Sequence, residues 1–331
     1  MYSVPALIVK CGANKERTRS EKEEDITNAI IKVTHTEEKS LYFLTGHGER
    51  DINGETDAFG MGIIKRLLED KRYSVKEFEM SRQQGIPEDC AVLVIAAPQT
   101  DLFEHELTAL ERYLNLGGNV IVLLEPETAP QLAAWLAKYG LKVGNEIICE
   151  AEVQADIASL LQGKLSGRLS VSTAPVIGKR NYGTHEITRD FDLATQYPSS
   201  RSVSVTDTLP AGITADKILE TKGELENAPD ASIPGSWAET DLEMLRQQQA
   251  QYDEGVDMKG PVTLAALVTI DRHNFEPAKA AEAAVASATD IQRPDKSRLL
   301  VFGDSDFATN SGVRYDRGVL FTNCINYLIG A

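Results

Sequence analysis

The chain has 331 residues, and its 42% of hydrophobic residues are enough for the core of one large domain or of two smaller ones. It carries 34 basic and 50 acidic residues, and the net charge of -16 excludes binding to nucleic acid or to an anionic membrane surface unless a local basic patch is present. The sequence contains no such patch, because the basic residues at 15–22 alternate with acidic ones, as in a solvated turn.

The cysteines are scattered along the chain without a CxxC pair or any metal-ligand spacing. The sequence therefore predicts neither a zinc site nor a dense disulfide framework, and leaves one or two disulfides open. No apolar run reaches the roughly eighteen residues of a membrane-spanning helix, and the first residues lack the pattern of a signal peptide. Read alone, the sequence predicts a soluble chain. The four cysteines are Cys11, Cys90, Cys149 and Cys324.

Residues 1–40 are predicted to contain one strand near 4–11 and one helix over 21–34, whose apolar residues share a face. One strand and one amphipathic helix cannot bury a core of their own. We therefore expect this piece to be the remnant of a preceding domain or to dock on the following one.

From Leu41 onwards, buried-type strands alternate with helical patterns. Runs such as AVLVIAAP and NVIVLLEP are typical of parallel strands that are covered on both faces. The pattern predicts an α/β domain over 41–331 with a doubly wound, mostly parallel sheet and an inserted irregular region at about 145–260, which is either a subdomain or a decoration of the sheet. Strands are expected at 41–45, 73–79, 91–97, 119–124, 261–270 and 298–307, helices at 57–71, 102–116, 129–139 and 317–329, and a helix or loop at 278–288.

Polar residues follow four of these strands directly. Because the carboxyl ends of parallel strands lie at one edge of a sheet, these groups are expected to converge on a single crevice. Asp101 and Thr128 have a simpler explanation as caps of the helices that follow them. The four strand ends are Gly46-His47-Gly48-Glu49, Ala97-Pro98-Gln99-Thr100-Asp101, Leu124-Glu125-Pro126-Glu127-Thr128 and Gly303-Asp304-Ser305-Asp306.

The sequence offers a possible base but no nucleophile. Histidine is a common general base, and His47 could activate water together with Glu49, Asp304 or Asp306, which makes a hydrolase the alternative hypothesis. A GxSxG motif and a cysteine in a strand-to-helix turn are both absent, and FGMG at 59–62 lacks the Lys-Ser/Thr of a phosphate loop. The sequence therefore predicts no catalytic residue, no resident metal and no cofactor.

The order and spacing of several motifs resemble the soluble region of GldG-type auxiliary proteins of ABC transport systems, the gliding-motility family, over most of the chain. The motifs are EDITNA at 24–29, LYFLTGHGE at 41–49, GTHEIT at 183–188, SWAET at 236–240, DMKGPVTLAALV at 257–268, GDSDFATN at 303–310 and LFTNCINYLIG at 320–330.

This resemblance implies an extracytoplasmic, periplasmic domain that works beside a permease and an ATPase and is anchored by membrane helices outside this chain. It also implies a flavodoxin-like α/β domain similar to class I glutamine amidotransferase-like and intraflagellar-transport-like domains, without established catalytic activity. The leading hypothesis is a non-catalytic binding subunit whose sheet edge holds a polar ligand or a partner loop. Carbohydrate is a reasonable ligand, because carboxylates and amides suit hydroxyl groups and an indole can stack on a sugar. The candidate binding residues are His47, Glu49, Gln99, Glu125, His185, Trp237, Asp304 and Asp306.

Overall fold

The buried runs of the sequence form the strands of one seven-stranded sheet in the computed structural model, which describes residues 7–12, 14–18, 22–34, 39–82, 85–155, 167–225, 233–285 and 294–330. Five of the strands are parallel; β16 runs antiparallel to β17, and β13 runs antiparallel to β16. The prediction of an α/β fold with a large, mostly parallel sheet is thus confirmed. The order is β13 (Ile213–Glu220), β16 (Thr263–Asp271), β17 (Lys296–Phe302), β6 (Asn119–Leu123), β5 (Cys90–Ala96), β3 (Ser40–Thr45) and β4 (Ser74–Glu79).

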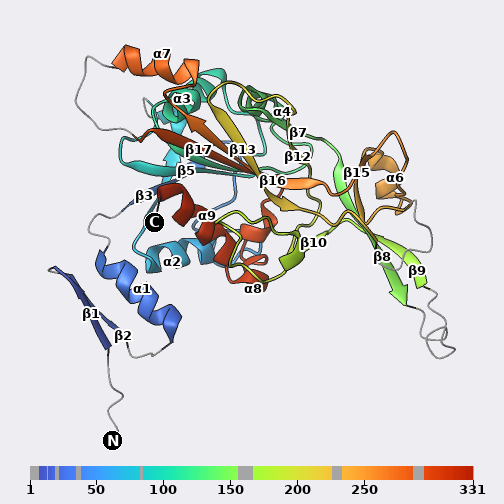
Figure 1. Cartoon of the computed structure of the whole chain (residues 1–331), viewed down its shortest axis with the longest axis horizontal. Coiled ribbons are helices and arrows are strands. Elements are labelled where there is room, and N and C mark those ends of the chain that lie inside the picture. The colour runs from blue at the N-terminus through green and yellow to red at the C-terminus, as the bar shows by residue number, and fades with distance from the viewer. Residues whose placement is uncertain are drawn as a thin grey trace, which may run out of the picture.

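Helices cover both faces of this sheet (Figure 1). Alternate residues of β5 explain why: Val92 and Val94 belong to the core beneath one helical layer, whereas Leu93 and Ile95 belong to the core beneath the other. One layer contains α2 (Gly62–Asp70), α8 (Val313–Asp316) and α9 (Val319–Ile329), and the other contains α3 (Glu104–Asn115), α4 (Pro130–Leu136) and α7 (Glu276–Val285).

The chain order of the parallel strands reverses between β3 and β5. The chain goes from β3 outwards to β4, and then returns past β3 to β5, β6 and β17. At such a reversal the connections leave to opposite faces of the sheet, which opens a crevice at the carboxyl ends of the two strands. The loops after β3 and β5 flank this switch point.

A second sheet of four antiparallel strands extends from the main body, at the right of Figure 1. It is built from residues on both sides of β13, so the region 145–260 supplies this sheet and also an edge strand of the main sheet. The order is β15 (Met258–Lys259), β14 (Ser236–Glu239), β8 (Ile147–Ala155) and β9 (Gly167–Ser172); α6 (Leu242–Arg246) lies beside it.

The N-terminal residues form a hairpin of β1 (Leu7–Cys11) and β2 (Asn14–Thr18), against which α1 (Glu23–Thr34) packs. The turn expected at 15–22 is therefore partly a strand, because residues 14–18 pair with β1, although Lys15 and Arg17 remain exposed. The remaining pairs are β7 (Leu141–Val143) with β12 (Val203–Val205) and β10 (Val176–Ile177) with β11 (Thr195–Gln196), and the 3-10 turns are η1 (Met80–Arg82), η2 (Ala137–Tyr139), η3 (Lys179–Asn181) and η4 (Asp306–Ala308).

Two predicted helices differ clearly from the structure. The helix expected over 129–139 is α4, which ends at Leu136 and continues as the 3-10 turn η2. The helix expected from residue 57 begins at Gly62, because the preceding residues form a loop that is bonded to the loop after β17. The Ala-rich stretch is helical up to Val285, and the end of the range predicted for it lies outside the described residues. All four cysteines are free thiols, and none of the described helices combines the length and the apolar character needed to span a membrane.

Candidate functional site at the carboxyl edge of the sheet

The loops that follow β3, β5, β6 and β17 contact one another at one edge of the sheet. The Arg50 amide donates to the Ala96 carbonyl at 2.8 Å, and the Gln99 amide donates to the His47 carbonyl at 2.8 Å. The Ser305 amide donates to the Glu125 carboxylate at 3.2 Å. The parallel topology therefore brings the four polar strand ends into one neighbourhood.

Two glycines let the chain turn sharply after β3. Gly46 and Gly48 have φ angles of 118° and 80°, in the left-handed region that side chains rarely tolerate. A Cβ atom on Gly48 would also lie 3.0 Å from the Cβ atom of Gln99. The turn consequently folds back against the loop after β5 and directs the His47 side chain towards α3.

His47 is clamped between two carboxylates. Its Nδ1 atom lies 3.1 Å from Glu49 Oε1, its Nε2 atom lies 2.8 Å from Glu106 Oε2, and its amide donates to Glu49 Oε2 at 2.8 Å. All three side chains are at most 5% exposed. Both ring nitrogens are thus engaged inside the protein, and neither is free to take a proton from a ligand.

Glu106 is a site residue that the sequence interpretation did not include. It is fully buried, and its Oε2 atom also accepts the Phe103 amide at 2.8 Å at the start of α3. Glu106 lies three residues after Phe103, the residue that precedes α3, and a glutamate at this position is a capping signal that could have drawn attention to it. Its link to His47 could not be found that way, because the two residues are 59 positions apart.

A second cluster surrounds Arg50, which the sequence interpretation also did not include. The guanidinium donates to Asp306 at 2.9 Å, to Glu125 at 3.3 Å and to the Ser305 hydroxyl at 3.1 Å. The Ser305 hydroxyl in turn donates to Glu125. The side chains of Arg50, Glu125 and Asp306 are 20%, 16% and 23% exposed, so this cluster, unlike His47, reaches solvent.

Asp304 lies behind this cluster and is completely buried. Its Oδ1 atom accepts the Phe307 amide at 3.2 Å, and its Oδ2 atom has no hydrogen-bond partner. Burial raises the pKa of Asp304 well above its usual value, and the charges of Glu125 and Asp306 act in the same direction. Burial and Glu125 also raise the pKa of Asp306, against the effect of Arg50.

Of the pairs proposed for a hydrolase, the structure forms that of His47 with Glu49. Asp304 and Asp306 belong instead to the surroundings of Arg50, where Asp306 is its ion-pair partner. Ala97 directly follows β5 and has a φ angle of 54°, so the chain turns sharply there. A hydrolase of this architecture could carry its nucleophile at such a turn. A methyl side chain at this position cannot attack a substrate.

Of the three remaining predicted residues, Gln99 lies at this edge, whereas His185 and Trp237 lie elsewhere. The Gln99 amide group bonds the Ala97 carbonyl at 3.0 Å and lies at the switch point. His185 packs edge-on against Tyr327 near the end of α9, and burial lowers its pKa against the nearby charge of Asp216. It is therefore associated with α9 and β13 and does not join the strand-end groups.

Trp237 lies in β14 of the second sheet and is 1% exposed. Its indole nitrogen donates to Glu239 at 3.2 Å, and its ring packs with Cys149 and Tyr252. Its faces are covered, so the stacking role expected from the sequence does not agree with its burial.

The two predicted helix caps need correction. Asp101 accepts the amides of Gln131 at 2.7 Å and Leu132 at 3.3 Å, and so caps α4, not the helix that follows it. The Thr128 hydroxyl donates to the Glu125 carbonyl at 3.0 Å. Both side chains therefore stabilise the loops of the edge, because tertiary neighbours offer them partners that the local sequence does not show.

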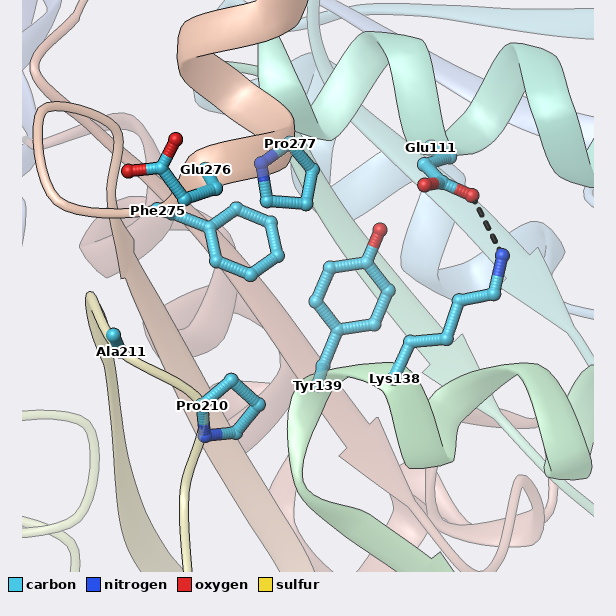
Figure 2. A pocket seen from close by; sticks show the side chains of 8 residues that line it. All are labelled: Glu111, Lys138, Tyr139, Pro210, Ala211, Phe275, Glu276 and Pro277. Carbon is cyan, nitrogen blue, oxygen red and sulfur yellow. Dashed lines mark hydrogen bonds and ion pairs between the residues drawn. The ribbon is translucent and has the colours of Figure 1, made fainter.

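A cavity of about 440 Å³ lies away from these clusters, among α3, η2, the loop before β13 and the start of α7 (Figure 2). Tyr139, Phe275 and Pro277 form its apolar walls, and an ion pair of Lys138 with Glu111 at 2.8 Å stands at its side. None of the residues predicted from the sequence lines it.

The described residues contain no group of three or more His, Cys, Asp or Glu side chains placed to hold a metal ion. Three of the four thiols lack the features of nucleophiles: Cys90, Cys149 and Cys324 are buried, and burial raises the pKa of Cys90 and of Cys149 to about 12. The fourth, Cys11, is exposed, but it lies in β1 of the N-terminal hairpin and not at this edge. The polar chemistry of the edge therefore consists of the His47 clamp, the Arg50 cluster and the Gln99 amide.

The solved structures that resemble this chain are distant from it in sequence. The mmIFT52 N-terminal domain is 14% identical, with a TM-score of 0.50, and the match covers 87% of this chain and 97% of that one. A putative ThuA-like protein from Bacteroides uniformis is 12% identical, with a TM-score of 0.41, over 88% and 91% of the two chains. A putative GMP synthase protein from Thermoplasma acidophilum is 9% identical, with a TM-score of 0.34, over 88% and 97%.

The comparison with curated proteins gives no match. The family described as ABC-type uncharacterized transport system matches residues 38–323, which include the whole seven-stranded sheet and every strand end of the candidate site. The chain therefore belongs to this family of ABC-type transport system proteins.

Proposed function

We propose that this chain is a non-catalytic auxiliary subunit of an ABC transport system, and that the carboxyl edge of its sheet binds a polar ligand. Membership of the transport-system family supports a permease and an ATPase as its partners. In this proposal the chain is a GldG-type, gliding-motility protein, acts on the periplasmic face of the membrane, and is anchored by helices outside this chain.

The proposal of a non-catalytic role rests on one observation: the polar side chains that could take part in catalysis are paired with one another. Both nitrogens of His47 face buried carboxylates, and Asp306 and Glu125 are paired with Arg50. A general base must reach the proton that it removes, and a nucleophile must be exposed. Groups that satisfy one another in this way are better suited to hold the shape of a binding surface than to turn over a substrate.

The strand order supports a flavodoxin-like sheet, since the parallel strands follow the order 2-1-3-4-5. In such sheets ligands bind at the switch point, where Gln99 and the turn of His47 lie. We place the ligand there, with the Arg50 cluster beside it. Hydroxyl groups of a carbohydrate could bond the amide of Gln99 and the partly exposed carboxylates of Glu125 and Asp306.

For the domain organisation, we propose that residues 1–40 are a unit which docks on the α/β domain. An ion pair between Glu16 in β2 and Arg72, at 3.4 Å, supports this contact. Residues 145–260 then combine an inserted sheet with β13 of the main sheet.

Affinity purification from the native cells tests the assembly. The tagged full-length protein should enrich the permease and the ATPase of one ABC transporter over an unrelated bait with the same tag. The double variant Glu125→Gln, Asp306→Asn should retain this enrichment, because the edge is assigned to a ligand. Absence of transporter subunits with the wild type would overturn the auxiliary role, and their loss in a folded double variant would assign the edge to a partner loop instead.

A further inference from the structure

Two phenylalanines at the sheet edge are the exposed Phe, Tyr or Trp side chains among those that the structure describes. Phe59 is 53% exposed and Phe103 is 61% exposed. Both contact the turn after β3: the Arg50 guanidinium lies 5.1 Å from the centre of the Phe59 ring, and the His47 and Phe103 rings are 6.0 Å apart. An exposed apolar residue is ordinary by itself, but two aromatic rings against one polar turn indicate a binding surface.

The backbone that carries Phe59 is firmly held. The Asn310 side-chain amide donates to the carbonyls of Gly54 at 2.6 Å and Asp57 at 2.7 Å, and its oxygen accepts the Ile63 amide at 2.9 Å. The Ser311 hydroxyl donates to the Ala58 carbonyl at 2.8 Å. A ring presented on an ordered loop loses little conformational entropy when a ligand binds to it.

The backbone at Phe103 is fixed as well. Its amide donates to buried Glu106, which also holds His47. One side of its ring stacks on His105, at 5.7 Å between ring centres and with an angle of 13° between the planes. The ring therefore projects from the first turn of α3, and its large exposed area is available to a ligand.

The charges around the rings disfavour a charged ligand. The Arg50 guanidinium already makes a cation–π contact with the Phe59 ring and would repel a second cation there. An anion would meet the carboxylates of Glu125 and Asp306 and the overall net charge of -16. An uncharged ligand with C–H groups on its face and hydroxyl groups on its rim satisfies both the rings and the carboxylates.

We infer that Phe59 and Phe103 are the stacking residues of this edge and that they select an uncharged carbohydrate. They take the role that the sequence suggested for Trp237, which is buried. This inference rests on the proposed ligand-binding function of the edge and adds the residues and the charge class of the ligand.

Isothermal titration calorimetry of the purified chain tests the inference with defined probes. The uncharged probes are cellotetraose, mannotetraose and N-acetylchitotetraose, and the charged probes are tetragalacturonate and chitosan tetramer. At least one uncharged probe should bind, and the charged probes should bind more weakly. Phe59→Ala and Phe103→Ala should each weaken binding by about fivefold or more, because each removes a stacking contact, whereas Phe→Tyr at either position should retain it.

Val256→Ala is the matched control, because Val256 is 69% exposed but precedes β15 in the second sheet. Equal binding of charged and uncharged probes, absence of binding by every uncharged probe, or unchanged binding by both alanine variants would overturn the inference. If it fails while the tagged protein still enriches the transporter subunits, the auxiliary role stands without this ligand. If the enrichment fails too, the proposed function itself is wrong.

Discussion

Replacing Glu106 should open the His47 clamp and destabilise the protein strongly. In Glu106→Ala, the buried His47 Nε2 atom and the Phe103 amide each lose an acceptor that lies 2.8 Å away. Each buried donor that is left without an acceptor costs roughly 1–3 kcal/mol, so the loss of both should cost roughly 3–5 kcal/mol. In a chain of this size, each kcal/mol corresponds to roughly 2 °C in Tm, so we expect a decrease of about 6–10 °C.

Thermal unfolding followed by circular dichroism measures this effect, with Glu104→Ala as the control. Glu104 lies in the same first turn of α3, but its side chain is exposed, so its removal should cost only about 0.3–1 kcal/mol of favourable interaction with the helix dipole. Glu106→Gln, whose amide oxygen can still accept from both donors but carries no negative charge, should fall between the two variants. Equal Tm values for Glu106→Ala and Glu104→Ala would refute the clamp.

Two further changes test the backbone and the buried acid of the edge. Gly48→Ala should lower the free energy of unfolding, measured in urea, by about 1–2 kcal/mol, because Gly48 has a φ angle of 80° and little space beside Gln99. Gly178→Ala is the control and should change stability little, because no atom lies within 4 Å of the new Cβ. A similar loss in both variants would contradict the explanation. Asp304→Asn should stabilise the protein at neutral pH. Folding raises the pKa of Asp304, so above the usual pKa of 3.8 the folded state retains a proton that the unfolded state releases. The stability of the wild type therefore falls as the pH rises above that value. The advantage of the variant in Tm should grow from pH 4 to pH 8, and an advantage independent of pH would show that burial of this carboxyl is not its cause.

The helical and strand periods of the sequence were sufficient to predict six of the seven strands of the main sheet, whereas β13 lies in the region that was expected to be irregular. Strands such as β5 and β6 are buried on both faces, so their apolar runs stand out without knowledge of their neighbours. The hydrophobic period of a strand does not show whether the strand runs parallel or antiparallel to its neighbours. The run TLAALVTID therefore gives no sign that β16 pairs antiparallel with β17.

The residues of the site were predictable only in part. His47, Gln99, Glu125, Asp304 and Asp306 follow strands directly, and strand ends of a parallel sheet must lie at its edges. His185 and Trp237 lie in segments whose position depends on how β13 and the second sheet dock, so local pattern could not place them.

The sequence by itself determined the layers of the fold and the polar character of its carboxyl edge, because hydrophobic period and strand-end composition are local properties. Only the tertiary structure decided which polar groups meet. Arg50 and Asp306 are 256 positions apart, and the strand order joins them, while the turn after β3 directs His47 towards Glu106. The same contacts decide which groups remain available: burial closes His47 and Trp237 to solvent, and the loop held by Asn310 leaves Phe59 exposed.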